Sequence, residues 1–241
     1  MGFSPEWLSL REPVDRQARD ADLLARAVRA AGSDPVIMDL GCGTGSTLRA
    51  FAAHLPDHAT WHLIDNDPAL LQIARTQTSG NCQTHVLDLG NLDALPLDGV
   101  TLVTASALLD LMPANWVGDL ATRLAARGIG FYGALSYDGV MQWEPALPRD
   151  PQITDAFNHH QRSDKGLGQA LGPDAATFAL ESFAKAGFDV SHASTPWRID
   201  ADHAAMHREL VQGIAEAAAQ AGASMTEEWA RARIGMAADS L

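Results

Sequence analysis

The chain has 241 residues, a formal net charge of −13, 46% hydrophobic residues and 20% charged residues. This composition is ordinary for a soluble globular protein, and the length suits one α/β domain with an elaboration. The acidic balance argues against nucleic-acid binding, because a phosphate backbone requires clustered Lys and Arg. The two cysteines form no disulfide framework, and no apolar run has the length of a signal or membrane segment. We therefore expect a cytoplasmic protein.

Strand-like and helix-like segments alternate from residue 15 to residue 136. The first expected element is a helix that Asp15 caps and Gly32 ends. Short apolar runs then predict strands at 35–40, 61–65, 84–88, 98–106 and 128–136. Amphipathic segments predict helices that begin near Ser46 and that span 67–76 and 113–128. Such alternation implies a parallel sheet with helices on both faces.

The alternation breaks after residue 136. An Asp138-Gly139 turn predicts a hairpin through 140–143. Residues 144–173 form a long polar connection, for which we expect an ordered lid with a short helix near 152–161. The remaining predicted elements are a helix at 174–187, strands at 188–195 and 196–199, and helices near 202–221 and 225–235.

Three segments are expected from this order. Residues 1–34 would form an N-terminal helical cover, and residues 201–241 would form C-terminal helices. Residues 35–200 would form the central domain, with a lid-like insert at 137–173.

The strongest functional signal is residues 39–45, Asp-Leu-Gly-Cys-Gly-Thr-Gly, directly after the first predicted strand. Glycines let the backbone turn tightly and approach a ligand closely. The spacing is not that of a dinucleotide fingerprint, because residue 46 is serine, and the loop lacks the lysine of a phosphate-binding loop. An acid two residues before the first glycine suits a cationic ligand better than a pyrophosphate.

Residues 36–45, VIMDLGCGTG, resemble motif I of the class I S-adenosylmethionine (SAM)-dependent methyltransferases. The resemblance implies a Rossmann-like α/β fold with a seven-stranded, mainly parallel sheet. It also implies that the loop lies against the methionine part of SAM. The residues that match this role are Asp39, Gly41, Cys42, Gly43 and Gly45.

Further residues at strand ends extend the predicted cofactor site. Asp65 ends the second strand, where a carboxylate accepts hydrogen bonds from ribose hydroxyls in many nucleotide-binding enzymes. The resemblance places Asn66 beside the adenine, and Asp88 with Leu89 at the adenine amino group. It also places Ser106, after the fourth strand, at the methionine end of the site.

A general base is needed only if the methyl acceptor is a hydroxyl or a protonated amine. The candidates are His159, His160, Asp110 and Tyr137. The two histidines could equally belong to an exposed polar loop, and Asp110 could instead cap the helix that follows the fourth strand. We expect no metal site, because no third ligand accompanies the spaced histidines of the C-terminal region.

The sequence therefore predicts a SAM-dependent methyltransferase that acts on an oxygen or nitrogen of a small molecule, without nucleic acid or membrane. The apolar C-terminal helices are compatible with packing on a second copy of the chain, as a homodimer. The chain lacks the Asn-Pro-Pro-Tyr type of motif after the fourth strand, which weighs against methylation of nucleobase amino groups. Two alternatives stay open: an NAD(P)-dependent oxidoreductase on a related sheet, and a non-catalytic SAM-binding partner subunit.

Overall fold

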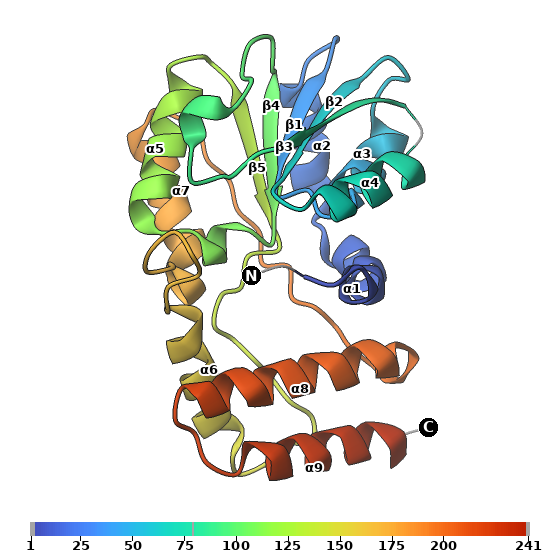
Figure 1. The fold of residues 1–241 in the computed structure, drawn as a ribbon, viewed down its shortest axis with the longest axis vertical. Coiled ribbons are helices and arrows are strands. Elements are labelled where there is room, and N and C mark those ends of the chain that lie inside the picture. The colour runs from blue at the N-terminus through green and yellow to red at the C-terminus, as the bar shows by residue number, and fades with distance from the viewer. Residues whose placement is uncertain (1–2, 79, 240–241) are drawn as a thin grey trace.

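A five-stranded parallel sheet forms the centre of the computed structural model, which describes residues 3–78 and 80–239. Its strand order is β3-β2-β1-β4-β5, and all four pairings are parallel (Figure 1). The strands are β1 (Val36–Leu40), β2 (Thr60–Asp65), β3 (Asn81–Val86), β4 (Leu102–Ser106) and β5 (Gly130–Ala134). The strand order reverses between β1 and β4, and such a switch point opens a crevice at the carboxyl ends of the strands.

The central strands are apolar on both faces because helices cover the sheet on both sides. On one face, α2 (Ala21–Ala30), α3 (Ser46–Phe51) and α4 (Pro68–Gln77) pack against Ile37 and Trp61. On the other face, α5 (Ala114–Ala125) and α7 (Ala175–Lys185) pack against Met38 and Val103. These two layers confirm the predicted α/β sandwich around a parallel sheet (Figure 1).

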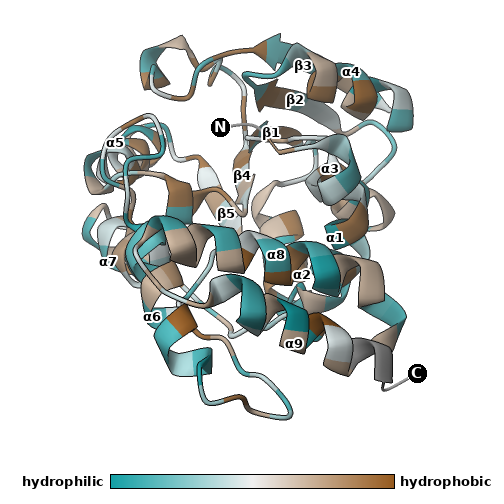
Figure 2. Ribbon diagram, turned by 60° about the horizontal axis from the view of Figure 1, so that its bottom comes forward, coloured by the Kyte–Doolittle hydropathy of each residue, from teal (hydrophilic) through white to brown (hydrophobic). Residues whose placement is uncertain are grey.

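Four further helices lie beyond the carboxyl ends of the strands, below the sheet in Figure 1. They are α1 (Pro5–Ala18), α6 (Asp150–Gln161), α8 (Ala204–Gln220) and α9 (Thr226–Asp239). Figure 2 shows both hydrophilic and hydrophobic segments on α8 and α9, as expected for amphipathic helices. Their apolar side chains form a separate core with α6 that includes Ile153, Ile214 and Trp229. Within the described residues, no helix has the length and apolar character needed to span a membrane.

The N-terminal region differs from the single helix that the sequence predicts. Asp15 caps no helix; it lies buried inside α1, where its carboxylate accepts hydrogen bonds from Arg11 at 2.8 and 3.1 Å. The cap of α2 is Asp20, whose side chain accepts from the backbone N–H of Leu23 at 2.8 Å. The chain is extended at Arg19 and Asp20, and this break separates the two helices.

The expectation of seven strands is wrong: the sheet has five in the part of the chain that the structure describes. The hairpin predicted through 140–143 and the strands predicted at 188–195 and 196–199 are absent from those residues. Residues 189–194 are exposed, so their side chains gain little from a sheet face. Side-chain contacts hold this segment instead, since Arg26 binds the carboxylate of Asp189 at 2.7 Å and its backbone carbonyl at 3.1 Å.

The α6–α9 contact contains a buried ion pair. Arg233 of α9, 3% exposed, donates to both carboxylate oxygens of Asp150 and also to the carbonyl of Pro145 at 2.6 Å. Trp229 donates its indole N–H to Asp150 at 2.8 Å, and the Arg233 guanidinium stacks over Trp143 at 4.9 Å. The pair therefore connects the start of α6 to α9.

We predict that Asp150→Ala will lower the free energy of unfolding by about 3–5 kcal/mol, because it leaves a buried guanidinium without its counter-ion. Urea unfolding followed by circular dichroism measures this change. The double variant Asp150→Ala/Arg233→Met is the matched control, since it removes both charges and should be more stable than Asp150→Ala alone. A double variant that is less stable than Asp150→Ala would contradict this account.

Candidate active site

A cavity of about 330 Å³ lies where the carboxyl ends of β1, β2 and β4 meet α1 and the loop between α6 and α7. The structure brings eight of the ten predicted cofactor residues to its wall. They are Gly41, Cys42, Gly43, Asp65, Asn66, Asp88, Leu89 and Ser106. The other two, Asp39 and Gly45, lie behind the wall, where Asp39 is buried and Gly45 precedes α3.

The glycine loop has a backbone that other residues adopt only with strain. Gly41, Gly43 and Gly45 have φ angles of +64°, +52° and +86°, in the left-handed region that favours glycine. Asp65 holds this loop, because its Oδ2 accepts the backbone N–H of Gly43 at 2.8 Å while its Oδ1 accepts that of Asp67 at 3.0 Å. The acid at the end of β2 thus shapes the loop as well as facing the cavity.

Asp39 is the most unusual group near the cavity. Its carboxylate is 1% exposed, and its Oδ1 accepts a hydrogen bond from the Thr104 hydroxyl at 2.7 Å. Its Oδ2 is buried without a hydrogen-bond partner among the described residues. Burial raises the pKa of Asp39 to about 7. A donor or cation in the cavity would relieve this cost, and the ammonium of SAM has that chemistry.

Arg19, between α1 and α2, lies behind the cavity wall and was not identified by the motif analysis. Its Nη2 donates to the Ser106 hydroxyl at 3.0 Å, and Ser106 also accepts from the Thr47 hydroxyl at 3.0 Å. The Nη1 of Arg19 is buried without a partner among the described residues. The nearby guanidinium also opposes the upward pKa shift of Asp39. Arg19 therefore brings a positive charge to the side of the cavity formed by β4 and α3.

Asp110 stands beside a different part of the cavity. It follows β4 in a short 3-10 turn (Leu109–Leu111), and its neighbours Leu108 and Leu111 line the cavity. Its Oδ1 is buried without a partner among the described residues, and burial raises the pKa of Asp110 to about 6. The charges of Arg11 and Lys165, which also line the cavity, act against that shift.

None of the four candidate bases lines the cavity itself, and the remaining three engage other parts of the molecule. The Tyr137 hydroxyl donates to Asn158 of α6 at 2.6 Å, and burial raises the pKa of this phenol. His159 and His160, near the end of α6, border a separate surface depression beside α8. His160 contacts Gln220 through its Nε2 at 3.0 Å, and burial lowers its pKa. The polar sequence around the histidines gave no information on which way α6 turns them.

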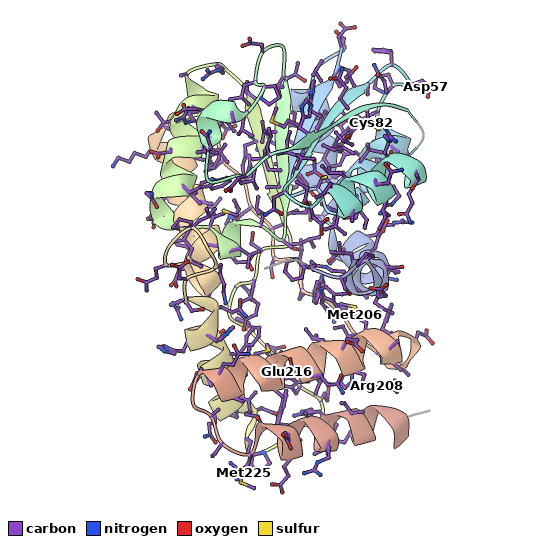
Figure 3. The ribbon with its side chains drawn as sticks, in the orientation of Figure 1. Asp57, Cys82, Met206, Arg208, Glu216 and Met225 are labelled. Carbon is purple, nitrogen blue, oxygen red and sulfur yellow. The ribbon has the colours of Figure 1, made fainter. Side chains whose placement is uncertain are left out.

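Helix α1 closes the cavity on the side away from the sheet. Leu8 approaches the loop so closely that a Cβ on Gly43 would lie 3.2 Å from its Cδ1. Glu12 accepts two hydrogen bonds from Arg49 of α3, at 2.7 and 2.6 Å. On its other side, α1 rests on α8, whose buried Met206 lies between the two helices in Figure 3.

Comparison with known proteins agrees with this geometry. Residues 37–128, which run from β1 to just beyond α5, match a family model described as a methyltransferase domain. The cyclopropane synthase MmaA2 from Mycobacterium tuberculosis is similar in structure, with a TM-score of 0.56 and 15% identity over 98% of this chain and 89% of that one. A search of curated protein sequences gives no match.

A second similar structure is the complex between the Haloferax volcanii Trm112 methyltransferase activator and a candidate methyltransferase. Its TM-score is 0.51 and its identity 20%, over 78% of this chain and 74% of that one. At such identities the likeness establishes the fold, and the domain match establishes the enzyme class. The fold is Rossmann-like. Residues 37–128 form a methyltransferase domain, and the fold is that of the class I SAM-dependent methyltransferases, enzymes whose cofactor is SAM.

We predict that Gly43→Val will weaken SAM binding at least about tenfold. The left-handed backbone costs a residue with a Cβ about 1–2 kcal/mol, and the branched side chain would also press on Leu8 at the cavity wall. Isothermal titration calorimetry with SAM measures the change. Gly99→Val is the matched control, because Gly99 also has a positive φ, of +77°, but faces open space. Equal SAM affinities in the two variants would contradict the placement of the site.

We also predict that Asp39→Asn will stabilise the cofactor-free protein at neutral pH. The pKa of Asp39 is raised on folding, so the stability that its proton provides below pH 4 is lost as the pH rises to about 7. The advantage of the variant in free energy of unfolding should therefore grow between pH 4 and pH 7 and then level off at about 4 kcal/mol, which unfolding curves recorded at each pH measure.

SAM affinity of Asp39→Asn should fall at the same time, because an amide offers no negative charge to an ammonium. Asp57→Asn is the control, since Asp57 lies at the exposed surface shown in Figure 3. A stability difference that does not change with pH would show that Asp39 is ionised throughout.

Proposed function

We propose that this methyltransferase transfers the methyl group of SAM to an oxygen or nitrogen atom of a small molecule, with Asp110 as the general base. The observation that carries the proposal is the buried, unpartnered Oδ1 of Asp110 beside the cavity. Its pKa of about 6 keeps most of the carboxyl ionised at pH 7 and still close to the range where a base accepts a proton efficiently.

The cofactor end of the cavity is proposed to work through placement and charge. Asp39 faces the ammonium of SAM, Arg19 offsets the SAM carboxylate, and Asp65 accepts from the ribose hydroxyls. Asn66, Asp88 and Leu89 would surround the adenine. When bound, SAM supplies an electrophilic methyl carbon on its sulfonium, so the chain needs to orient the acceptor and remove its proton.

Several features support a small acceptor. The cavity is covered by α1 on one side and bordered by Lys165, Gly166 and Leu167 of the α6–α7 loop on another, so it is narrow for a macromolecule. Part of its lining is apolar, with Phe3, Leu8 and Met112 among the lining residues. We propose that the N-terminal helices and the insert at 137–173 form the cover of this site, as the sequence suggests. Tyr137 receives no chemical role here because its hydroxyl is engaged with α6.

The partners and the location rest on sequence arguments. The net charge of −13 supports a protein that acts without nucleic acid, and we propose a cytoplasmic setting. The apolar side chains of α8 and α9 pack against each other and against α6. The apolar side chains of these two helices, which suggested a homodimer, are thus largely packed within one chain.

We predict that the rate of SAH formation will rise with pH through about pH 6 and that Asp110→Asn will abolish this rise. A general base must be deprotonated to act, and its loss typically costs about 10²–10⁴-fold in rate. The assay measures SAH released from SAM with a library of phenols and amines. Asp98→Asn, at an exposed acid, is the control. If Asp110→Asn retained both the wild-type rate and its pH dependence, another group would have to be the base.

A further inference from the structure

Lys165 stands out among the charged residues that line the cavity. It belongs to the loop between α6 and α7, and its Nζ donates to the backbone carbonyl of His160 at 3.1 Å and contacts His160 Nδ1 at 3.4 Å. No carboxylate lies within 4.0 Å of this ammonium among the side chains that the structure describes, those of residues 3–78 and 80–236. Lys165 is therefore a cation at a cavity wall without a direct counter-ion in the described chain.

The loop that carries Lys165 is ordered by its own hydrogen bonds. Asp164 accepts the backbone N–H of Gly166 at 2.7 Å and that of Gly168 at 3.0 Å. Leu167 packs on the segment after β3, where a Cβ on Gly90 would lie 2.8 Å from its Cδ2. The position of Lys165 at the wall is thus set by contacts on both sides of it.

The other cations near the cavity are already compensated or belong to its other end. Arg11 forms a two-point ion pair with Asp15, whose carboxylate also accepts from Trp197 at 2.9 Å. Arg19 is bonded to Ser106, on the side of the cavity formed by β4 and α3. The charge of Asp110 acts to raise the pKa of Lys165, but Asp110 and Lys165 form no direct ion pair.

A partly buried ammonium without a counter-ion is costly, and burial lowers the pKa of Lys165 accordingly. The chain carries a net charge of −13, yet none of its described carboxylates pairs directly with this lysine. An anionic group on a bound molecule would offset the desolvation cost of this ammonium. The adjoining wall is apolar, with Leu111, Met112 and Leu167.

We propose that the methyl acceptor carries an anionic group, a carboxylate or a phosphate, which pairs with Lys165 while its apolar body rests on the leucine and methionine side chains nearby. The acceptor atom then lies on the Asp110 side of the cavity. This inference rests on the proposed function, because it names the class of small molecule that the same cavity takes.

The first test measures binding to the SAH-loaded protein by calorimetry, with benzoate, phenyl phosphate and benzamide as probes of matched shape. We expect benzoate or phenyl phosphate to bind at least about tenfold more tightly than benzamide, and the tighter of the two identifies the anion. Lys165→Met should remove this preference and Lys165→Arg should retain it. Lys185→Met is the matched control, because Lys185 is the other lysine of the chain and is exposed on α7.

Three results would overturn the inference. They are equal binding of benzamide and the anions, absence of binding by all three probes, and an anion preference that persists in Lys165→Met. A loss of SAH affinity in Lys165→Met would likewise overturn it, because Lys165 would then serve the cofactor.

A second assay separates this inference from the proposed function. It compares methylation of phenol and aniline with methylation of 4-hydroxybenzoate and 4-aminobenzoate. Faster turnover of the acids, lost in Lys165→Met, supports both proposals. Equal turnover of neutral and acidic acceptors leaves the small-molecule function standing and overturns the anionic acceptor. No turnover of any of them, with SAM bound, counts against both.

Discussion

The site depends on a carboxylate that the fold removes from water before any ligand arrives. Asp39 occupies the end of the central strand, pairs with Thr104 on one oxygen and leaves the other unpartnered. A charge so deeply buried is costly despite the nearby Arg19, and burial raises the pKa of Asp39 to about 7. A ligand that brings a cation to this point recovers part of that cost. In the proposed site, stability and cofactor binding would therefore oppose each other at this residue.

The glycine loop connects Asp39 to the other residues of the proposed cofactor site. Asp65 holds the backbone N–H of Gly43, so the loop is shaped by the next strand as well as by its own glycines. Arg49 connects the helix that follows the loop to Glu12 of α1, and a hydrogen bond from Arg49 to the Thr44 carbonyl at 2.6 Å fixes the loop itself. The cover over the cavity and the loop beneath it are consequently parts of one network of ion pairs.

The proposed acceptor side is assembled differently, from segments that are distant in the sequence. Asp110 comes from the turn after β4, Arg11 from α1 and Lys165 from the loop between α6 and α7. The buried pair of Asp150 and Arg233 connects α6 to α9. It thereby stabilises the position of α6, the helix that precedes the loop with Lys165. The proposed cofactor end is thus built mainly on the sheet, whereas the proposed acceptor end draws on the helices below it.

The local sequence was enough to determine the parallel α/β layers, the glycine loop and the acids at the strand ends, because strand periodicity and glycine spacing are short-range properties. Tertiary structure alone decided the rest. Residues 188–199 have strand-like composition but no strand beside them, so the sheet stops at five strands. His160 turns to α8 while Lys165, five residues later, reaches the cavity. Such directions depend on how α6 packs against α8, which no pattern within α6 encodes.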